Sequence, residues 1–486
     1  MTRIQVRKMS LTTAQKERLQ VMQDVSMRES MAAVDFVGLG LALVTDEQKR
    51  VIGLATDGDI RRALLKGIAI DSPIRNVMNP SPAIARKEDE KSGWRDLFSR
   101  DICRLLSEAD VLKVPVVDRG GRVIDMLLLH REDGTPPSQG MVLPVKAVLV
   151  IGGAGYLGSV LCRLLLQRGY HVRVLDSLMF GLDPIAELEG RPGFELVKGD
   201  VRHLEMVAKA MKSIDAVIHL AAIVGDEACN LDPEETIEAN HLATRMVAEV
   251  SRYYQVNRFI FASTCSNYGA SRDPDAWLTE DSAVSPVSLY ARMKVESERA
   301  FLELEDENFA PTIFRMATLF GLSPRMRFDL VVNNFAIRAL RQRTVTVFGG
   351  SQWRPLLHVT DAAEALVKCL EAPFGKVYGQ VFNVGGNELN YRIEDVAHIV
   401  KDEVPEARIV VNEGKADPRN YRVAFDKVER ALAFRPKMSL RDGVREILEA
   451  VRAGRFFDWP SSRYSNAAHL EGYTQGAQLQ EATAGE

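Results

Sequence analysis

The chain has 486 residues, of which 46% are hydrophobic and 26% charged, and its formal net charge is −4. This length suggests about three domains of ordinary size, and the composition is that of a soluble globular protein with sizeable cores. A nucleic-acid-binding protein would normally carry a basic excess, so no nucleic-acid partner is expected.

The sequence predicts neither a membrane span nor a secretory signal. No apolar run approaches the roughly 18 residues that a transmembrane helix needs, and Met1–Lys8 lacks the apolar core of a signal peptide. The five cysteines are odd in number and scattered, which is typical of free thiols in a reducing cytoplasm. The eight histidines show no metal-ligand spacing. We therefore expect a cytoplasmic protein with no membrane partner and no catalytic metal.

The first 135 residues contain a faint internal repeat. Residues 49–60 are similar in sequence to residues 121–132, and each segment follows an apolar predicted strand, at 40–44 and at 113–117. A strand, a turn, a second strand and a helix, repeated once, predict two copies of one small α/β module. The repeat resembles a tandem CBS-domain pair.

The resemblance to CBS domains implies a regulatory or oligomerisation module. In such modules a Thr-x-x-Asp element binds the phosphate and ribose of an adenine nucleotide, and Thr56 and Asp59 supply it here. Leu128 and Arg131 stand at the equivalent positions of the second copy, so at most one intact site for AMP, ADP or ATP is expected. The alternative is that the pair serves only as a dimerisation scaffold.

A segment rich in Gly, Pro and Ser separates this region from the rest of the chain. Residues 133–144 cannot continue a helix or a central strand, and we assign residues 136–144 as a linker. Residues 145–460 are predicted to form the larger domain. The last segment, 461–486, is polar with small side chains, and we expect it to be a flexible tail.

A buried strand followed by a glycine-rich turn opens the larger domain. The apolar run 146–151 predicts a strand buried on both faces, and Gly152, Gly155 and Gly158 follow it. These glycines allow a tight turn, close approach of the backbone to a phosphate and close packing of helix on strand. The N-terminus of the next helix offers free N–H groups and a favourable dipole to a dinucleotide pyrophosphate.

A second predicted strand, 171–176, ends in Asp176, 18 residues after Gly158. A carboxylate at this place accepts hydrogen bonds from the adenosine ribose hydroxyls and repels a 2′-phosphate, which favours NAD over NADP. The alternative is that Asp176 is an ordinary turn residue.

Thr264, Tyr290 and Lys294 are the candidate catalytic residues. Residues 258–264 predict a strand that ends in hydroxyl side chains, which reach a ligand beyond the carboxyl edge of a parallel sheet. Tyr290 and Lys294 are four residues apart on a predicted helix and share one of its faces; taken alone, such a pair is more often a solvated surface feature. The lysine charge would stabilise phenolate and make the tyrosine a base near neutral pH. With the glycine turn, these residues indicate a nicotinamide cofactor and hydride transfer.

The order of predicted elements indicates an α/β fold. Residues 146–310 alternate strands and helices, as in a Rossmann-type doubly wound parallel sheet. Residues from 311 onward mix short strands and helices and predict a small C-terminal α/β part that binds the substrate. The tandem CBS module precedes both.

The segment 145–453 resembles an extended short-chain dehydrogenase/reductase of the NAD-dependent sugar-nucleotide epimerase/dehydratase family. The matching motifs occur in the family's order along the chain. They are Gly152-x-x-Gly155-x-x-Gly158, Asp176, Gly199-Asp200, His219-Leu-Ala-Ala222, Ser263-Thr264-Cys-Ser-Asn-Tyr-Gly269, Tyr290-x-x-x-Lys294, the segment from Arg354 to Asp361, and Phe382-Asn-Val-Gly-Gly386.

The resemblance implies roles for individual residues. Tyr290 is expected to be the base, Thr264 to hydrogen-bond the same sugar hydroxyl, and Lys294 to hold the nicotinamide ribose. Asp200 is expected to meet the adenine. The full set of expected contacts to NAD is Gly152, Gly155, Tyr156, Leu157, Gly158, Asp176, Asp200, Val201, Leu220, Ala221, Ala222, Asn240, Tyr290 and Lys294.

The expected substrate is a nucleotide-diphosphate sugar. Arg354 and Arg419 resemble the arginines that grip its diphosphate, since two guanidinium forks suit that anion; ordinary ion pairing at the surface is the alternative. Asn334 is expected to join Thr264 in binding the substrate. The predicted helices at 242–250 and 290–304 are those through which this family usually dimerises. CBS pairs also self-associate, so a homodimer or homotetramer is expected.

The two residues after Thr264 distinguish between reactions of the family. Sugar-nucleotide 4,6-dehydratases carry an acidic pair there, which eliminates water, whereas this chain has Cys265 and Ser266. Neither is an acid–base group for elimination, and we expect Cys265 to have a packing role. The expected reaction is therefore C4 epimerisation of the sugar through a 4-keto intermediate. The alternatives are C4 reduction of a 4-keto sugar nucleotide and, for a non-enzyme, a nucleotide-sensing scaffold.

Overall fold

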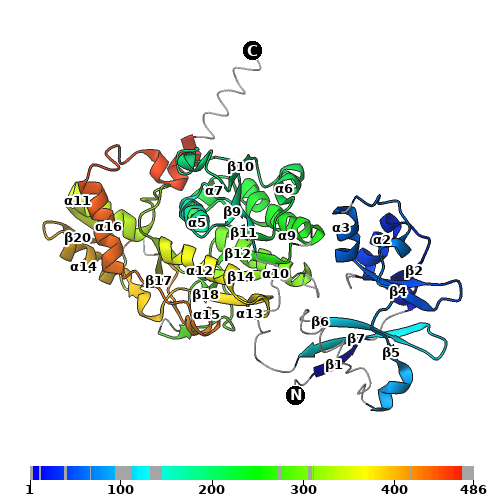
Figure 1. The fold of residues 1–486 in the computed structure, drawn as a ribbon. Coiled ribbons are helices and arrows are strands. Elements are labelled where there is room, and N and C mark those ends of the chain that lie inside the picture. The colour runs from blue at the N-terminus through cyan, green and yellow to red at the C-terminus, as the bar shows by residue number, and fades with distance from the viewer. Residues whose placement is uncertain are drawn as a thin grey trace. The chain divides into compact units, whose positions relative to one another are not determined.

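The computed structural model describes residues 4–9, 13–37, 41–65, 67–92, 111–131, 145–254, 256–271, 273, 275–304, 309, 311–412, 414 and 417–472. The chain forms two compact units, one over Met1–Pro144 and the other over Val145–Glu305 and Phe309–Glu486 (Figure 1). The predicted linker, 136–144, lies outside the described residues. None of the helices in the described ranges is long and apolar enough to cross a membrane.

The N-terminal unit contains the strands of the predicted repeat, but Leu128 and Arg131, the equivalents of Thr56 and Asp59 at the start of a helix, lie in a strand in the second copy. In the first copy β2 pairs parallel with β3, and β3 pairs antiparallel with β4; in the second copy β5, β6 and β7 repeat this arrangement. β1 extends the second sheet by pairing with β7. The elements are β1 (Ile4–Met9), α1 (Thr13–Leu19), β2 (Gln20–Met22), α2 (Met27–Val37), β3 (Leu41–Thr45), β4 (Val51–Thr56), α3 (Asp57–Leu65), β5 (Ala85–Arg86), β6 (Val111–Val117) and β7 (Val123–Arg131).

The two copies close equivalent turns in the same way. The turn between β3 and β4 is closed by Asp46, whose side chain accepts the backbone N–H of Arg50, and Asp118 accepts that of Arg122 in the turn between β6 and β7. The members of each equivalent pair are 72 residues apart in the sequence. Arg50 and Arg122 also form an antiparallel bridge with each other, so the two equivalent turns meet.

The larger unit is built on a parallel sheet with the strand order β10-β9-β8-β11-β12-β14-β18. Every neighbouring pair is parallel, and the order reverses between β8 and β11, as in a doubly wound sheet. The predicted Rossmann-type fold is confirmed. The strands are β8 (Ala147–Ile151), β9 (His171–Asp176), β10 (Phe194–Lys198), β11 (Ala216–His219), β12 (Arg258–Thr264), β14 (Thr312–Met316) and β18 (Val381–Val384).

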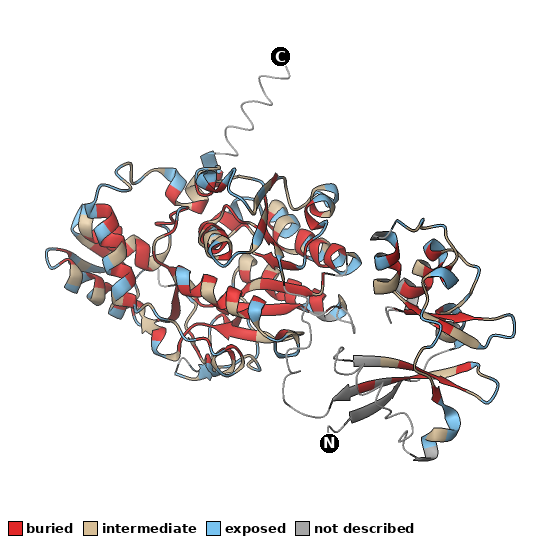
Figure 2. Ribbon diagram, viewed as in Figure 1, coloured by how far each residue is buried: buried red, intermediate tan, exposed pale blue. Residues whose placement is uncertain are grey.

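The sheet is buried on both faces because helices cover each of them (Figure 2). Successive residues of a strand point to opposite faces, so Val148 and Val150 belong to one core, whereas Leu149 and Ile151 belong to the other. One core includes α5 (Tyr156–Gln167) and α12 (Val359–Glu371). The other includes α6 (Leu204–Met211), α9 (Ala243–Tyr253) and α10 (Leu289–Leu304).

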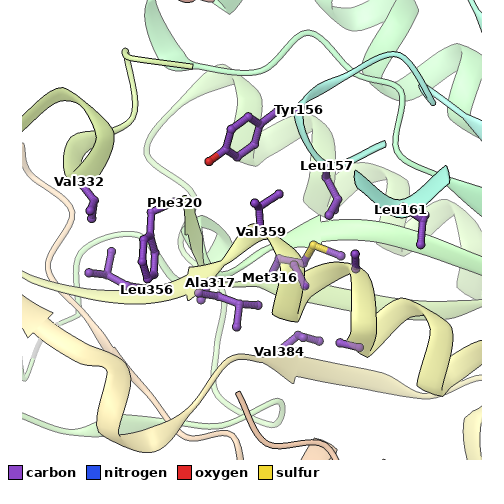
Figure 3. Close-up of a cluster of buried hydrophobic side chains, with 14 of the residues drawn as sticks. Tyr156, Leu157, Leu161, Met316, Ala317, Phe320, Val332, Leu356, Val359 and Val384 are labelled. Atoms are coloured by element: carbon purple, nitrogen blue, oxygen red, sulfur yellow. The ribbon is translucent and has the colours of Figure 1, made fainter. Parts of the chain in front are cut away.

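The C-terminal part shares the first of these cores and is not a separately packed domain. Figure 3 shows where the two parts meet: Tyr156 and Leu161 of α5 lie with Phe320, Val332 and Leu356 in one cluster of buried side chains. This part consists of β15 (Thr318–Phe320), α11 (Val331–Gln342), β16 (Thr344–Phe348), β17 (Trp353–His358), β19 (Asn390–Arg392), α14 (Ile393–Glu403), β20 (Arg408–Asn412) and α16 (Leu440–Arg452).

The end of the chain corrects one prediction. Residues 461–486 were expected to form a flexible tail, but residues 461–472 are folded, with a helical turn at 462–464 and a helix over 466–472. Asn466 is 5% exposed and Leu470 is 7% exposed. The carbonyl of Tyr464 accepts the N–H of Phe328 at 2.8 Å. A few anchoring residues therefore hold a segment whose average composition is polar.

Candidate active site

A cavity of about 1390 Å³ lies at the carboxyl edge of the parallel sheet. Its wall includes Gly152, Asp176, Leu220 and Thr264, which stand at or just after the ends of β8, β9, β11 and β12. Because these strands are parallel, their carboxyl ends share one edge, where ligands bind in open α/β sheets. Other wall residues come from the C-terminal part and from residues 459–467.

The glycine turn after β8 fits a dinucleotide pyrophosphate. Gly152 has φ of +87°, and a Cβ there would lie 2.7 Å from the backbone nitrogen of Ala221. A Cβ on Gly158 would lie 2.2 Å from the carbonyl oxygen of Gly152. Only glycine allows α5 to begin this close to the turn. No side chain caps the helix at Gly155, so its first N–H groups are available to an anion.

Asp176 braces this turn from the end of β9. One carboxylate oxygen accepts the N–H of Ala154 at 2.9 Å, and the other accepts that of Leu178 at 2.8 Å. Burial raises the pKa of Asp176, against the lowering by these two bonds. The residue therefore has the structural role of a turn residue and also lines the cavity, where each oxygen retains a lone pair for a ribose hydroxyl.

Asp200, the expected adenine contact, is bound to a neighbouring arginine. The guanidinium of Arg202 approaches both oxygens of Asp200, with its closest contact at 2.6 Å, and also lies 3.3 Å from Glu235. Asp200 and Val201 both line the cavity. The arginine orients the carboxylate at the cavity wall.

Tyr290 and Lys294 lie on one face of α10, as the spacing predicts. Lys294 is 2% exposed, and its ammonium donates to the carbonyl of Ala262 at 2.8 Å and lies 5.8 Å from the centre of the Tyr290 ring. Burial lowers the pKa of Lys294 to about 8. Burial also raises the pKa of Tyr290, contrary to the expectation that the lysine would lower it. Desolvation of the Tyr290 phenol is the largest influence on its pKa, and Lys294 is not among the main charges that shift it.

The lowered pKa of Lys294 predicts how stability changes with pH. Its ordinary value is 10.5, so between about pH 8 and 10.5 the unfolded chain binds a proton that the folded chain has released. Stability rises with pH wherever the unfolded state binds more protons. We expect the wild type to gain stability relative to Lys294→Met over this window in urea unfolding. Parallel pH profiles for the two proteins would contradict a buried, titrating Lys294.

The segment after Thr264 turns one side chain into the core and one into the cavity. The Thr264 hydroxyl accepts the N–H of Ser266 at 3.1 Å. Cys265 is 1% exposed, its thiol donates to the carbonyl of Arg315 at 3.1 Å, and burial raises its pKa. Cys265 is therefore packed in the core, whereas Thr264 and Ser266 both line the cavity.

A buried ion pair lies directly behind Thr264. Arg315 of β14 contacts Glu298 of α10 at 2.7 Å, and both side chains are 9% exposed. Glu298 also accepts hydrogen bonds from the hydroxyl of Ser263 at 2.5 Å and from the amide of Asn267 at 2.8 Å. One carboxylate thus ties together α10, β14 and the end of β12, the elements that carry Tyr290 and Thr264.

The two predicted diphosphate-binding arginines lie close together in the cavity wall. Arg354 contacts Asp417 at 2.8 Å, and its guanidinium also donates to the carbonyl of Arg419. Arg419 contacts the same Asp417 at 2.6 Å and Asp226 at 3.0 Å. Although burial raises the pKa of Asp417, hydrogen bonds from Arg419 and the charge of Arg354 hold it below its usual range. The ion pairs hold both guanidinium groups in place.

Of the residues predicted to bind NAD or the sugar nucleotide, only Asn240 lies away from the cavity wall. It is fully buried, and its side-chain amide makes two hydrogen bonds with the backbone of Ile223, at 2.7 and 2.8 Å. Its role is therefore to fix Ile223, which does line the cavity. Asn334 lies in the wall on α11, and its amide donates to the carbonyl of Phe328.

Three groups in the cavity wall were not predicted. Arg325 is buried there, Asp226 pairs with Arg419, and the wall residues between 461 and 467 come from the segment that was expected to be a tail. Arg325 stands in the arginine-rich run Pro324–Arg327, which is the one sequence signal that could have singled it out. Asp226 stands among other acidic residues, and nothing in that part of the sequence singles it out as a residue of the cavity wall.

Comparison with known proteins places this geometry among enzymes of one family. Residues 148–385 match the profile of the NAD dependent epimerase/dehydratase family. UDP-glucuronic acid decarboxylase 1 of Arabidopsis thaliana is 30% identical over 315 residues, covering 63% of this chain and 69% of that protein. dTDP-glucose 4,6-dehydratase of an Actinoplanes species is 28% identical over 322 residues, covering 63% of this chain and 98% of that protein.

A solved structure shows the same fold. UDP-glucuronic acid 4-epimerase from Bacillus cereus, in complex with UDP-glucuronic acid and NAD, superposes with a TM-score of 0.58 at 26% sequence identity. The match covers 63% of this chain and 99% of that chain. It extends over nearly the whole of the solved chain and leaves more than a third of the present chain outside.

Proposed function

The chain belongs to the NAD-dependent epimerase/dehydratase family, and we propose that it is a nucleotide-sugar C4 epimerase. The observation that carries this proposal is the segment Thr264–Ser266. Cys265 is packed in the core and Ser266 is the side chain that follows Thr264 into the cavity, so the acidic pair expected of a 4,6-dehydratase is absent from these positions. With NAD as the hydride acceptor, a hydroxyl and a phenol are the only side chains that reversible oxidation at C4 requires.

Tyr290 acts as the base in this proposal. Its phenolate removes the C4 hydroxyl proton while the C4 hydrogen leaves as hydride, and it returns the proton when the opposite face of the ketone is reduced. When bound, NAD supplies a reversible hydride acceptor, and it is regenerated by the end of each catalytic cycle. Thr264 holds the same hydroxyl from the end of β12, and Lys294 holds the nicotinamide ribose. Burial of Tyr290 means that the bound ligands have to provide the stabilisation of phenolate.

The paired arginines support a diphosphate substrate. Arg354 and Arg419 share Asp417 in the cavity wall, and an arriving diphosphate would replace that carboxylate as their partner. With the diphosphate anchored, the sugar would be free to rotate in the site between the two hydride transfers, so that its opposite face meets the cofactor. Asn334, on the α11 side of the cavity, would contact the nucleotide or the sugar.

The test is to incubate the protein with catalytic NAD and a panel of UDP-, dTDP- and GDP-sugars, and to identify products by NMR. We expect the C4 epimer of one sugar, without net NADH formation. Formation of a 4-keto-6-deoxy sugar, or of a pentose with release of carbon dioxide from a uronic acid, would reject the proposal in favour of a dehydratase or a decarboxylase. Steady consumption of NADH or NADPH would favour a C4 reductase.

Asp176→Ala tests the basis of cofactor preference. Because the carboxylate lies in the cavity wall beside the glycine turn, its removal should weaken NAD binding and relax the discrimination against NADP. Loss of a charge-assisted hydrogen bond corresponds to roughly tenfold or more in affinity. Calorimetric titration with both cofactors measures the effect. An unchanged preference would assign Asp176 to the turn alone.

Residues 465–472 should slow the release of the cofactor. The amide of Asn466 donates to the carbonyl of Val224 at 2.7 Å, and the ring of His469 lies 2.9 Å from the carbonyl of Met179, so the segment joins two loops at the cavity. Deletion of residues 465–486 should raise the NAD dissociation rate by about tenfold, equivalent to about 1.4 kcal/mol. Stopped-flow fluorescence measures that rate. The exposed Glu471→Ala is the control, and equal rates for the deletion and the wild type would refute this role.

For the N-terminal unit we propose a CBS-type module that binds an adenine nucleotide at Thr56 and Asp59 and promotes a homodimer or homotetramer. The Thr56 hydroxyl caps α3 by accepting the N–H of Asp59, and the Asp59 carboxylate accepts the hydroxyl of Thr56 at 2.7 Å and its backbone N–H at 2.9 Å. A nucleotide would have to compete with this cap. Calorimetry with AMP, ADP and ATP on the wild type and Asp59→Ala decides the matter. No heat and no stability change with the wild type at millimolar nucleotide would leave only the scaffold role.

A further inference from the structure

The guanidinium of Arg325 is a buried cation with no hydrogen-bonding partner in the described part of the chain. It stands between β15 and α11, it is 4% exposed, and it lines the cavity. All three guanidinium nitrogens lack a hydrogen bond there. An unpaired charge in such a place is costly, and native proteins rarely keep one without a ligand for it.

The neighbours of Arg325 cannot satisfy its charge. Asp329 is the nearby carboxylate, but it is held by Arg327 through contacts of 2.9 and 2.8 Å, and it also accepts the N–H of Asn466. Burial and the charge of Arg327 lower the pKa of Arg325 to about 10, which still leaves it protonated at neutral pH. The surroundings thus hold a free positive charge at the cavity wall.

The position of Arg325 indicates which anion it binds. The backbone N–H of Arg325 donates to the hydroxyl of Ser323 at 3.2 Å. That hydroxyl donates to the carbonyl of Tyr156, the first residue of α5, at 2.7 Å. Its guanidinium lies 4.1 Å from the centre of the Phe180 ring, four residues beyond Asp176. The residue therefore lies between the N-terminus of α5 and the loop that follows the ribose-binding strand.

Phe180 has a second neighbour. The ring of His469, in the folded C-terminal segment, lies 5.1 Å from the Phe180 ring. Phe180 thus contacts both Arg325 and His469, and the guanidinium is held in a defined plane. A fixed guanidinium loses little conformational freedom when it binds an oxyanion.

We propose that Arg325 binds the pyrophosphate of the bound dinucleotide, from the side facing the N-terminus of α5. The helix dipole and the free N–H groups of the glycine turn would contact one part of the anion, and the guanidinium would form charge-assisted hydrogen bonds to another. The inference depends on NAD as the cofactor and not on which reaction the enzyme catalyses.

Arg325→Met removes the charge and keeps an unbranched apolar side chain in place of the arginine stem, so it separates this role from most of the packing. We expect the affinities for NADH and ADP-ribose to fall by about 10–100-fold, while those for adenosine and UDP stay within twofold. The ligand-free variant should melt no lower than the wild type, because an unpaired buried charge has been removed. NADH fluorescence, calorimetry with the other ligands and thermal melts provide these values. Arg338→Met, at another arginine of the cavity wall, is the matched control and should leave NADH affinity unchanged.

The outcomes separate the possibilities. Unchanged NADH affinity would overturn the proposal, and so would an equal loss in Arg338→Met. A fall in UDP affinity without a fall in ADP-ribose affinity would overturn it too, by assigning Arg325 to the substrate diphosphate. Arg325→Lys should recover part of the NADH affinity and none of the bidentate geometry. None of these binding measurements requires turnover, so a failure of the epimerase assignment is recognised separately.

Discussion

Replacing Tyr290 with phenylalanine is expected to lower the turnover rate by about 10²–10⁴-fold, the usual contribution of a general base. In the proposed mechanism the Tyr290 phenolate takes the proton of the C4 hydroxyl, and in the variant the ring keeps its packing against the cluster that contains Ile223 and Cys229. NAD should still bind, because the glycine turn and Asp176 are untouched. Initial rates from product analysis, together with NADH titration of the same preparation, check both parts.

Tyr421→Phe is the matched control for this variant. Tyr421 is a buried tyrosine next to the site, and its hydroxyl lies 3.4 Å from that of Ser266, which lines the cavity. We expect less than roughly tenfold loss there, since this phenol is outside the Tyr-x-x-x-Lys pair. Near-full activity of Tyr290→Phe combined with a large loss in Tyr421→Phe would mean that the base had been assigned to the wrong residue.

Glu298→Ala is expected to cost about 3–5 kcal/mol in the free energy of unfolding of the larger unit, the usual result of leaving one member of a buried ion pair alone. The alanine leaves the Arg315 guanidinium without its carboxylate and also releases Ser263 and Asn267. Urea unfolding followed by tryptophan fluorescence measures the change. Activity should fall as well, since Thr264 loses its support.

Glu296→Ala serves as the control on the same helix. Glu296 pairs with Arg299 at 2.6 Å, but its side chain is 44% exposed, and exposed pairs contribute about 1 kcal/mol or less. Similar losses in the two variants would show that α10 itself, and not the buried pair, determines the stability. A replacement of both Glu298 and Arg315 by methionine should be less destabilising than either single change.

The parallel sheet and the glycine turn could be predicted because their causes are local. The apolar run before Gly152 and the alternation of strands and helices can each be recognised from a short window of sequence. The same holds for the repeat in the first unit, where Asp46 and Asp118 close equivalent turns. The positions of Thr264 and Tyr290 followed from the rule that ligands bind at the carboxyl edge of such a sheet.

Other features depend on contacts between distant segments. Asn240 was expected to touch NAD, but its amide binds the backbone of Ile223, a choice decided by side-chain orientation. The folding of residues 461–472 depends on Val224, Phe328 and Asp329, all more than a hundred residues away. The average composition of a segment does not reveal the few residues that bind it to distant parts of the chain.

Electrostatics in the site also escaped prediction, because burial changes the balance between charge and solvation. The spacing of Tyr290 and Lys294 predicted that the cation would lower the pKa of the phenol. In the folded chain Lys294 is bound to the carbonyl of Ala262, and desolvation dominates for both groups. The depth of a side chain in the fold is a tertiary property, and the sequence motif does not contain it.

The fate of the hydrogen at C4 tests the proposed epimerisation most directly. A nucleotide sugar that is accepted by the enzyme, deuterated at C4, is incubated with protein and catalytic NAD, and the product is examined by NMR and mass spectrometry. Epimerisation predicts that the deuterium returns to C4 with inverted configuration and that none accumulates in NADH. Deuterium found at C6 of a 4-keto-6-deoxy product, loss of the C6 carboxylate, or one deuteride per turnover in released NADH would contradict it.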